Sequence, residues 1–266
     1  MQPQQPAQPQ PHGAPGAPPP GAAPAPQAGG GAGAPIAHEI THGPSFAMVR
    51  ADLQPGQTLV AEAGSMVARH KHVGMDVKMN AGANAGFVQK AKAFLIALIR
   101  KFVGGETFFV NHFTAPQPGS VWIAPTMSGA VHYRRLQGET LTLSTGAYVA
   151  SCGPLDMKMK FGGLKSLLAK EGAFFLQISG HGDLWFNSYG GVTPIDVNGT
   201  YIVDNGHLVG WEGNLNFDIT SAGGGMMGFM ASGEGLVLKF NGQGRVYIQS
   251  RNPGALVDWL VRLQGG

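Results

Sequence analysis

Residues 138–149 read GETLTLSTGAYV, and related stretches occur at residues 56–67 (GQTLVAEAGSMV) and 199–209 (GTYIVDNGHLV). Each stretch holds a glycine, a short strand-like run, and a second glycine shortly before an apolar residue and a valine. Such a pattern is typical of one supersecondary unit that is copied in tandem. Because only three copies are present, we expect a closed, pseudo-threefold β body rather than an open solenoid.

A second motif follows each copy of the first. It begins at a glutamate that opens an apolar run, passes through a Gly-rich turn and ends in an aromatic strand. Its two halves lie at residues 105–109 and 121–123, 171–175 and 184–186, and 233–237 and 246–248. The repeats predict a mainly β fold, a β-sandwich or prism-like body, with units at about residues 44–127, 128–192 and 193–262.

Alternation of apolar and polar residues predicts strands at residues 75–79, 155–161 and 215–220, at the same place in each copy. Successive side chains of a strand point to opposite faces, so these strands should bury one face. Glycine-containing turns are expected to separate the strands, because glycine tolerates positive φ. These predicted turns lie at Pro55-Gly56, Pro118-Gly119, Gly180–Gly182, Asn198-Gly199, Asn205-Gly206 and Asn241-Gly242.

The first 37 residues form a separate region of the chain. They contain no Asp, Glu, Lys or Arg, and they hold most of the prolines. Such a composition cannot bury enough apolar surface to offset its ordering entropy, so residues 1–37 are predicted to be a disordered, solubilising tail. The tail has neither the apolar core of a secretory signal nor the arginines of a mitochondrial presequence. Residues 38–266 are then expected to form one β domain.

Overall composition limits the partners and the compartment. The net charge of +3 is too small to indicate a nucleic-acid partner. A single cysteine, Cys152, excludes an intrachain disulfide and suits a reducing compartment. No apolar stretch is long and uncharged enough to span a bilayer. These features predict a soluble, cytoplasmic protein.

One segment departs from the β pattern. Residues 87–103 contain no Pro, Gly or acidic residue and predict one short amphipathic helix with an apolar and a basic face. One interpretation is that this helix covers an open face of the β body. The other is that it contacts a protein partner or an anionic membrane surface, making the protein peripheral to the membrane. The predicted contact residues are Phe87, Lys90, Phe94, Leu95, Leu98, Arg100, Lys101 and Phe102.

Several motifs resemble those of the AIM24 family, which is related to a yeast mitochondrial biogenesis protein. They include GPSFAM at residues 43–48, LQPG at 53–56, DNGHLV at 204–209 and QSRNP at 249–253, and the resemblance covers about residues 38–262. It implies a fold like that of the tryptophan-attenuation protein, in a family whose members often form oligomers. It carries over no catalytic residues and no cofactor. The resemblance therefore implies a non-enzymatic binding or scaffold protein that forms homo-oligomers.

Two alternatives to the scaffold interpretation rest on other residues. His70 and His72, at alternate positions of a strand, would share one face with Asp76 nearby, as in a cupin-like metal- or small-molecule-binding protein. No second motif supplies a third histidine, so no metal or cofactor is predicted. An RNA-binding regulator would need exposed aromatic residues among Lys and Arg. Because they recur in the repeat, the aromatic residues Trp122, Trp185 and Tyr247 are predicted to be core layers instead.

Overall fold

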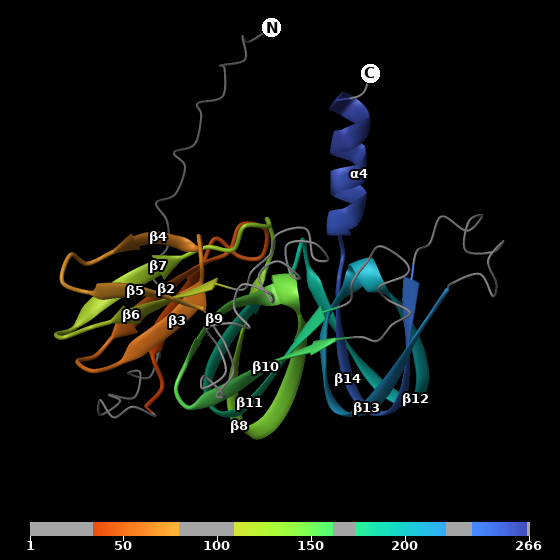
Figure 1. Cartoon of the computed structure of the whole chain (residues 1–266), viewed down its shortest axis with the longest axis horizontal. Helices are drawn as coiled ribbons and strands as arrows, with labels where there is room; N and C mark the ends of the chain where they lie inside the picture. Colours follow the sequence, from red (N-terminus) through yellow and green to blue (C-terminus); the bar gives the residue numbers. More distant parts are fainter. Residues whose placement is uncertain (1–33, 80–108, 162–173, 222–235, 265–266) are drawn as a thin grey trace, which may run out of the picture.

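The computed structural model describes residues 34–79, 109–161, 174–221 and 236–264, and its fold is mainly β, as predicted (Figure 1). Its strands are β1 (Ala37–Thr41), β2 (Met48–Leu53), β3 (Thr58–Glu62), β4 (Met66–Arg69), β5 (Gly74–Met79), β6 (Phe109–Thr114), β7 (Gly119–Ile123), β8 (Val131–Ser144), β9 (Tyr148–Cys152), β10 (Leu155–Phe161), β11 (Phe174–Asn187), β12 (Val192–Asp204), β13 (Leu208–Ser221) and β14 (Leu236–Gln249). Short 3-10 turns, η2 (Thr145–Ala147) and η3 (Asn205–His207), precede β9 and β13, and a helix, α4 (Pro253–Gln264), ends the described chain.

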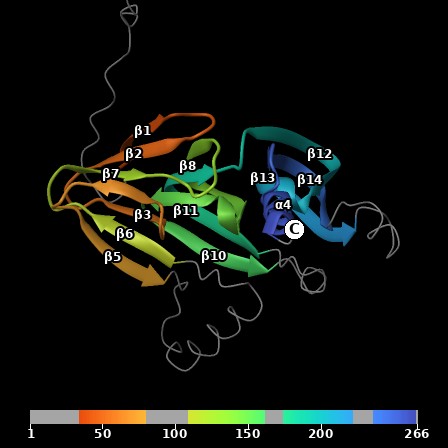
Figure 2. The ribbon, with the colours of Figure 1, turned by 90° about the horizontal axis from the view of Figure 1, so that it is seen from above.

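These strands form two sheets. The smaller sheet has the order β1-β2-β7-β4, and the larger has the order β12-β14-β13-β8-β11-β9-β3-β6-β5, with β10 paired to β11 (Figure 2). Among the described residues both sheets have unpaired edge strands. Their hydrogen bonds therefore do not close the sheets into the pseudo-threefold β body that the sequence predicts. The pseudo-threefold prism stays a prediction.

Each copy of the repeat contains a central strand with an antiparallel neighbour on either side. In the third copy β14 lies between β12 and β13, and in the second β11 lies between β8 and the pair β9 and β10. In the first copy the same arrangement is split between the two sheets: β7 lies between β2 and β4, and β6 lies between β3 and β5. The strand that carries the second motif is therefore central in every copy.

Glycines allow the long strands to curve without ending. The prediction of turns at Gly180–Gly182, Asn198-Gly199 and Asn241-Gly242 is wrong, because these residues lie inside β11, β12 and β14. Gly199 pairs directly with Gly242, and both have positive φ, +111° and +130°. Glycine inside a strand permits such a bend because it has no Cβ.

Prolines break the equivalent strands of the first copy. Pro55 lies between β2 and β3, and Pro118 lies between β6 and β7. Proline lacks the N–H that would continue a ladder, so the first copy divides between the two sheets. The turns predicted at Pro55-Gly56, Pro118-Gly119 and Asn205-Gly206 are confirmed. The strands predicted by alternation are also confirmed, within β5, β10 and β13. The expected burial of one face is wrong for β5, where Met75 and Val77 are both exposed.

A glycine also lies three positions before each recurrent aromatic residue: Gly119, Gly182 and Gly244. A Cβ at Gly182 would overlap the carbonyl oxygen of Cys152, and a Cβ at Gly244 would overlap that of Glu212. The aromatic residues themselves line the core: Trp185 and Tyr247 are buried, as predicted, and Trp122 is partly buried.

A buried carboxylate joins the first two copies. The Asp183 side chain on β11 is 1% exposed, and Arg135 Nη1 and the Tyr133 hydroxyl, both on β8, each donate to its Oδ1 at 2.8 Å. Its Oδ2 accepts the backbone N–H of Ile36, just before β1, at 2.8 Å. Burial, together with the hydrogen bond to Asp183, raises the pKa of Tyr133 to about 12. The chain that leads into the first copy is thereby fixed to the second.

We expect the Gly182→Ala substitution to lower the free energy of unfolding by about 2–3 kcal/mol, because the backbone of β9 must move to admit a methyl group. Urea denaturation followed by circular dichroism measures this. Gly146→Ala is the matched control, since a Cβ at Gly146 meets nothing within 4 Å. Equal effects of the two substitutions would contradict the role assigned to the close contact at Gly182.

The Asp183→Asn substitution should destabilise the fold by about 3 kcal/mol, because it replaces the buried carboxylate of the ion pair with Arg135 by a neutral amide. A lower urea midpoint of unfolding, with an unchanged slope of free energy against urea concentration, measures this loss of stability. Asp196→Asn removes the exposed ion pair with Arg245 and should leave the midpoint nearly unchanged. A midpoint for Asp183→Asn that matches that of the wild type would show that the buried carboxylate is not structural.

Candidate interaction surface

Helix α4 begins at a well-formed cap. The Asn252 side-chain oxygen accepts the backbone N–H groups of Gly254 at 2.8 Å and Ala255 at 3.3 Å. Pro253 occupies the first helical position, where its missing N–H costs no hydrogen bond. The β repeat does not predict this helix, although an Asn-Pro pair ahead of a helical apolar pattern is a start signal.

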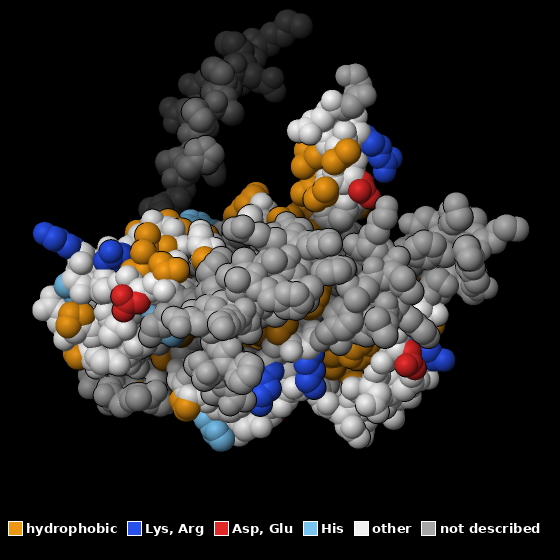
Figure 3. All heavy atoms as spheres, in the orientation of Figure 1, with side chains coloured by type: hydrophobic (Ala, Val, Ile, Leu, Met, Phe, Trp, Pro, Cys, Tyr) orange, Lys and Arg blue, Asp and Glu red, His pale blue; other side chains and the backbone are white. Residues whose placement is uncertain are grey.

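Most apolar side chains of α4 are exposed, and Leu256 in its first turn is half-buried. Leu256, Trp259, Leu260 and Leu263 follow the i, i+3, i+4, i+7 spacing of one helix face, and no residue of the helix is buried. Trp259 is 56% exposed and Leu263 is 61% exposed. Figure 3 shows the helix rising from the β body with hydrophobic side chains on one side and an acidic and a basic side chain on the other. No helix among the described residues is long and apolar enough to cross a membrane.

The eight predicted contact residues between Phe87 and Phe102 lie outside the described residues. The amphipathic helix and its basic face therefore stay a prediction. The glutamates that open the second motif, Glu106, Glu171 and Glu234, also lie outside the described residues.

The candidate metal site has a different geometry from the one predicted. His70 and His72 lie in the turn between β4 and β5, which a hydrogen bond from the Val73 N–H to the His70 carbonyl closes at 3.0 Å. The two rings stack with centroids 5.4 Å apart, and His70 Nδ1 accepts the Ser120 N–H at 2.8 Å. The prediction that they alternate along one strand with Asp76 is wrong. Among the described residues, no group of three His, Cys, Asp or Glu side chains could hold a metal ion.

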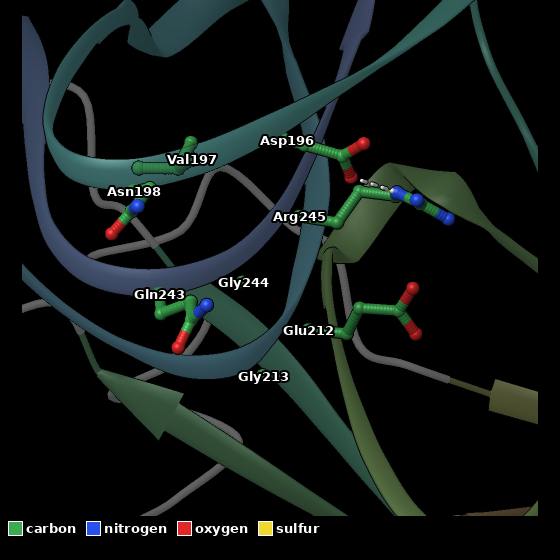
Figure 4. Close-up of a pocket in the computed structure, with 8 residues that line it drawn as sticks. All are labelled: Asp196, Val197, Asn198, Glu212, Gly213, Gln243, Gly244 and Arg245. Atoms are coloured by element: carbon green, nitrogen blue, oxygen red, sulfur yellow. Dashed lines mark hydrogen bonds and ion pairs between the residues drawn. The ribbon is translucent and has the colours of Figure 1, made fainter.

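A shallow pocket lies on the curved surface of β12, β13 and β14 (Figure 4). Arg245 Nε donates to Asp196 Oδ1 at 2.7 Å, and this bond lowers the pKa of the Asp196 carboxyl. Glu212 accepts hydrogen bonds at 2.7 Å from Arg134 of β8 and from the Tyr247 hydroxyl. The charged side chains that line the pocket are therefore already paired, and the Arg134–Glu212 contact joins the second and third copies.

Cys152 lies on β9 and is 5% exposed. Burial raises the pKa of its thiol to about 11. A nucleophilic cysteine needs a thiolate, and this thiol stays protonated near neutral pH. Its role is that of a small apolar residue in the core.

Comparisons with known proteins place this arrangement in a family. The family described as Mitochondrial biogenesis AIM24 matches residues 38–251. An uncharacterized protein of Streptococcus pyogenes serotype M6 is 31% identical over 216 residues, which are 80% of this chain and 85% of that protein. The crystal structure of a protein from Streptococcus pyogenes, 28% identical, matches with a TM-score of 0.68 over 86% of this chain and 99% of that chain. The resemblance in the sequence motifs is thus confirmed over most of the chain, which belongs to the AIM24 family.

Proposed function

We propose that the protein is a non-enzymatic binding or scaffold protein that engages another protein through helix α4. The observation that carries this proposal is the row of exposed apolar side chains on a helix that stands clear of the β body. Leu256, Trp259, Leu260 and Leu263 have the spacing by which one helix inserts into an apolar groove of a partner. Tryptophan and leucine on such a face supply large apolar contact areas, and tryptophan is enriched among binding hot spots.

Charge favours a protein partner over an anionic membrane for this helix. Helices that lie on anionic membranes carry several Lys or Arg residues on their polar face. The polar face of α4 has Arg262 and Asp258, one charge of each sign. The helix therefore gains nothing from an anionic surface beyond its apolar contacts, whereas a groove lined by apolar residues matches it.

Two features support a non-enzymatic role. The ionisable side chains of the pocket form mutual pairs, Asp196 with Arg245 and Glu212 with Arg134, which suits structural linkage. Cys152 is buried with a raised pKa. The apolar side chains that α4 exposes provide contact area, and they contain no acid, base or nucleophile.

Photo-crosslinking in the protein's own cells tests the proposal. A photoreactive amino acid that replaces Leu260 should give one discrete crosslinked product with another polypeptide. Adding Trp259→Asp should reduce its yield by about tenfold or more, because a charge enters the apolar contact. Asp258→Asn is the matched control on the polar face and should preserve the product.

The outcomes separate the alternatives. Products that form equally from Leu260 and from Arg262, which lies on the polar face, would contradict docking through the apolar face. A crosslink only to a second copy would assign α4 to self-association instead. Flotation of the purified protein with anionic phospholipid vesicles, lost on Trp259→Asp, would assign the helix to a membrane surface.

A further inference from the structure

Two short junctions connect the three copies of the repeat. Residues 59–61 of β3 pair with residues 150–152 of β9, and residues 141–143 of β8 pair with residues 210–212 of β13. Both junctions are antiparallel. In each, the strand after the first glycine of one copy (β3 or β8) pairs with the strand after the second glycine of the next copy (β9 or β13).

The repeat places the two junctions at equivalent positions. Leu59 follows Gly56 by the same three positions as Leu141 follows Gly138. Their partners, Cys152 and Glu212, each lie six positions after the second glycine of their own copy. The molecule therefore uses one junction twice, in the same register.

The strand after the second glycine of each copy (β4, β9 or β13) has an irregularity at the same position. The pairing with the central strand shifts register at Val67 in β4, at Val149 in β9 and at Val209 in β13. Val149 and Val209 are 0% and 1% exposed, whereas Val67 is 55% exposed. The residue before this valine shows the same difference in exposure: Met66 is 38% exposed, whereas its counterparts Tyr148 and Leu208 are buried. β4 thus has the form of a junction strand whose neighbour is missing among the described residues.

β12 shows the complementary feature. Ile202 follows Gly199 by the same three positions, so it is the counterpart of Leu59 and Leu141. Those two leucines are 0% exposed, whereas Ile202 is 58% exposed. Among the described strands, β12 pairs only with β14, and β4 pairs only with β7. Both halves of a third junction are therefore present with their apolar residues uncovered.

One chain cannot join these two halves, because β4 and β12 lie at opposite ends of its longest axis (Figure 1). We infer that β12 of one copy pairs with β4 of a second copy, antiparallel and head to tail, in the register of the two internal junctions. That register places Ile202 of one copy opposite His70 of the next, as Leu59 lies opposite Cys152. His70 directly follows β4, and its N–H still donates to the Ser120 carbonyl of β7 at 3.1 Å. A second copy is the occupant that the chain itself specifies, because it carries the matching edge.

The contact differs from a twofold dimer because it uses two different surfaces. Such a heterologous contact closes into a ring or continues as a filament. It also covers two sheet edges that carry exposed apolar residues and would otherwise invite unspecific pairing. It uses no residue of α4, so it stands independently of the proposed function.

Light scattering of the purified protein and two edge variants tests the inference. Val67→Asp alters β4 and Ile202→Asp alters β12, and both residues are exposed, so folding should be preserved. Wild type should assemble, and either variant alone should dissociate with a dissociation constant raised by about tenfold or more. Met159→Asp, an exposed position on β10, is the matched control and should assemble like wild type. Trp259→Asp on α4 should also assemble like wild type, which separates this test from that of the proposed function.

Mixing the two edge variants distinguishes head-to-tail contact from every symmetric one. The Val67→Asp copy keeps its β12 edge and the Ile202→Asp copy keeps its β4 edge, so the mixture should form a one-to-one dimer and nothing larger. A wild type that stays monomeric at all concentrations would overturn the inference. So would edge variants that, while folded by circular dichroism, assemble as wild type does.

Cysteine pairing checks the register without relying on loss of assembly. A chain with His70→Cys and a chain with Ile202→Cys should form a disulfide with each other on mild oxidation, since directly opposite residues of antiparallel strands bring their Cβ atoms within reach. Cys152 is buried and should stay reduced. Disulfides only between two chains of the same variant would rule out the proposed register.

Discussion

Close contact between neighbouring backbones at the bends of the strands is the constraint on which this fold depends. At Gly182 and Gly244 the central strands approach a neighbouring carbonyl so closely that no side chain fits. Gly213 faces Gly244 in the same way, and a Cβ there would lie 2.7 Å from the Gly244 Cα. Glycine lets the long strands of the second and third copies curve while their ladders continue. In the first copy a proline directly precedes the equivalent glycine, as Pro55 before Gly56 and Pro118 before Gly119, and this copy divides between two sheets.

Neighbouring copies meet along short ladders. Each of the two junctions consists of three residue pairs. Side chains then reinforce those short ladders: Asp183 ties the segment before β1 to β8, and Glu212 ties β13 to β8 through Arg134. What the described strands leave uncovered is apolar edge surface at β4 and β12, together with the face of α4.

The repeat predicts several strands of the β structure correctly, and each incorrect prediction of a turn, strand or helix has a physical cause. Alternation correctly predicted the strands around Asp156, Met75 and Asn216. Apolar side chains of β10 and β13 pack against the core, whereas Met75 and Val77 of β5 are exposed. The sequence does not distinguish a turn from a strand bend at Gly199 and Gly242, since positive φ occurs in both. The spacing of His70 and His72 fits a strand as well as a tight turn. The repeat pattern does not reveal helix α4, because the apolar positions of the helix follow directly on the last strand of the repeat.

The sequence by itself determined the family and the β class, because each depends on the local pattern of residue types. Only the tertiary structure decided whether a given repeat position is buried. Leu59, Leu141 and Ile202 are equivalent in sequence, yet the first two are buried at junctions and the third is exposed on an edge. The reason is that burial depends on whether another copy of the unit lies alongside, and that is a property of how the units are arranged in space.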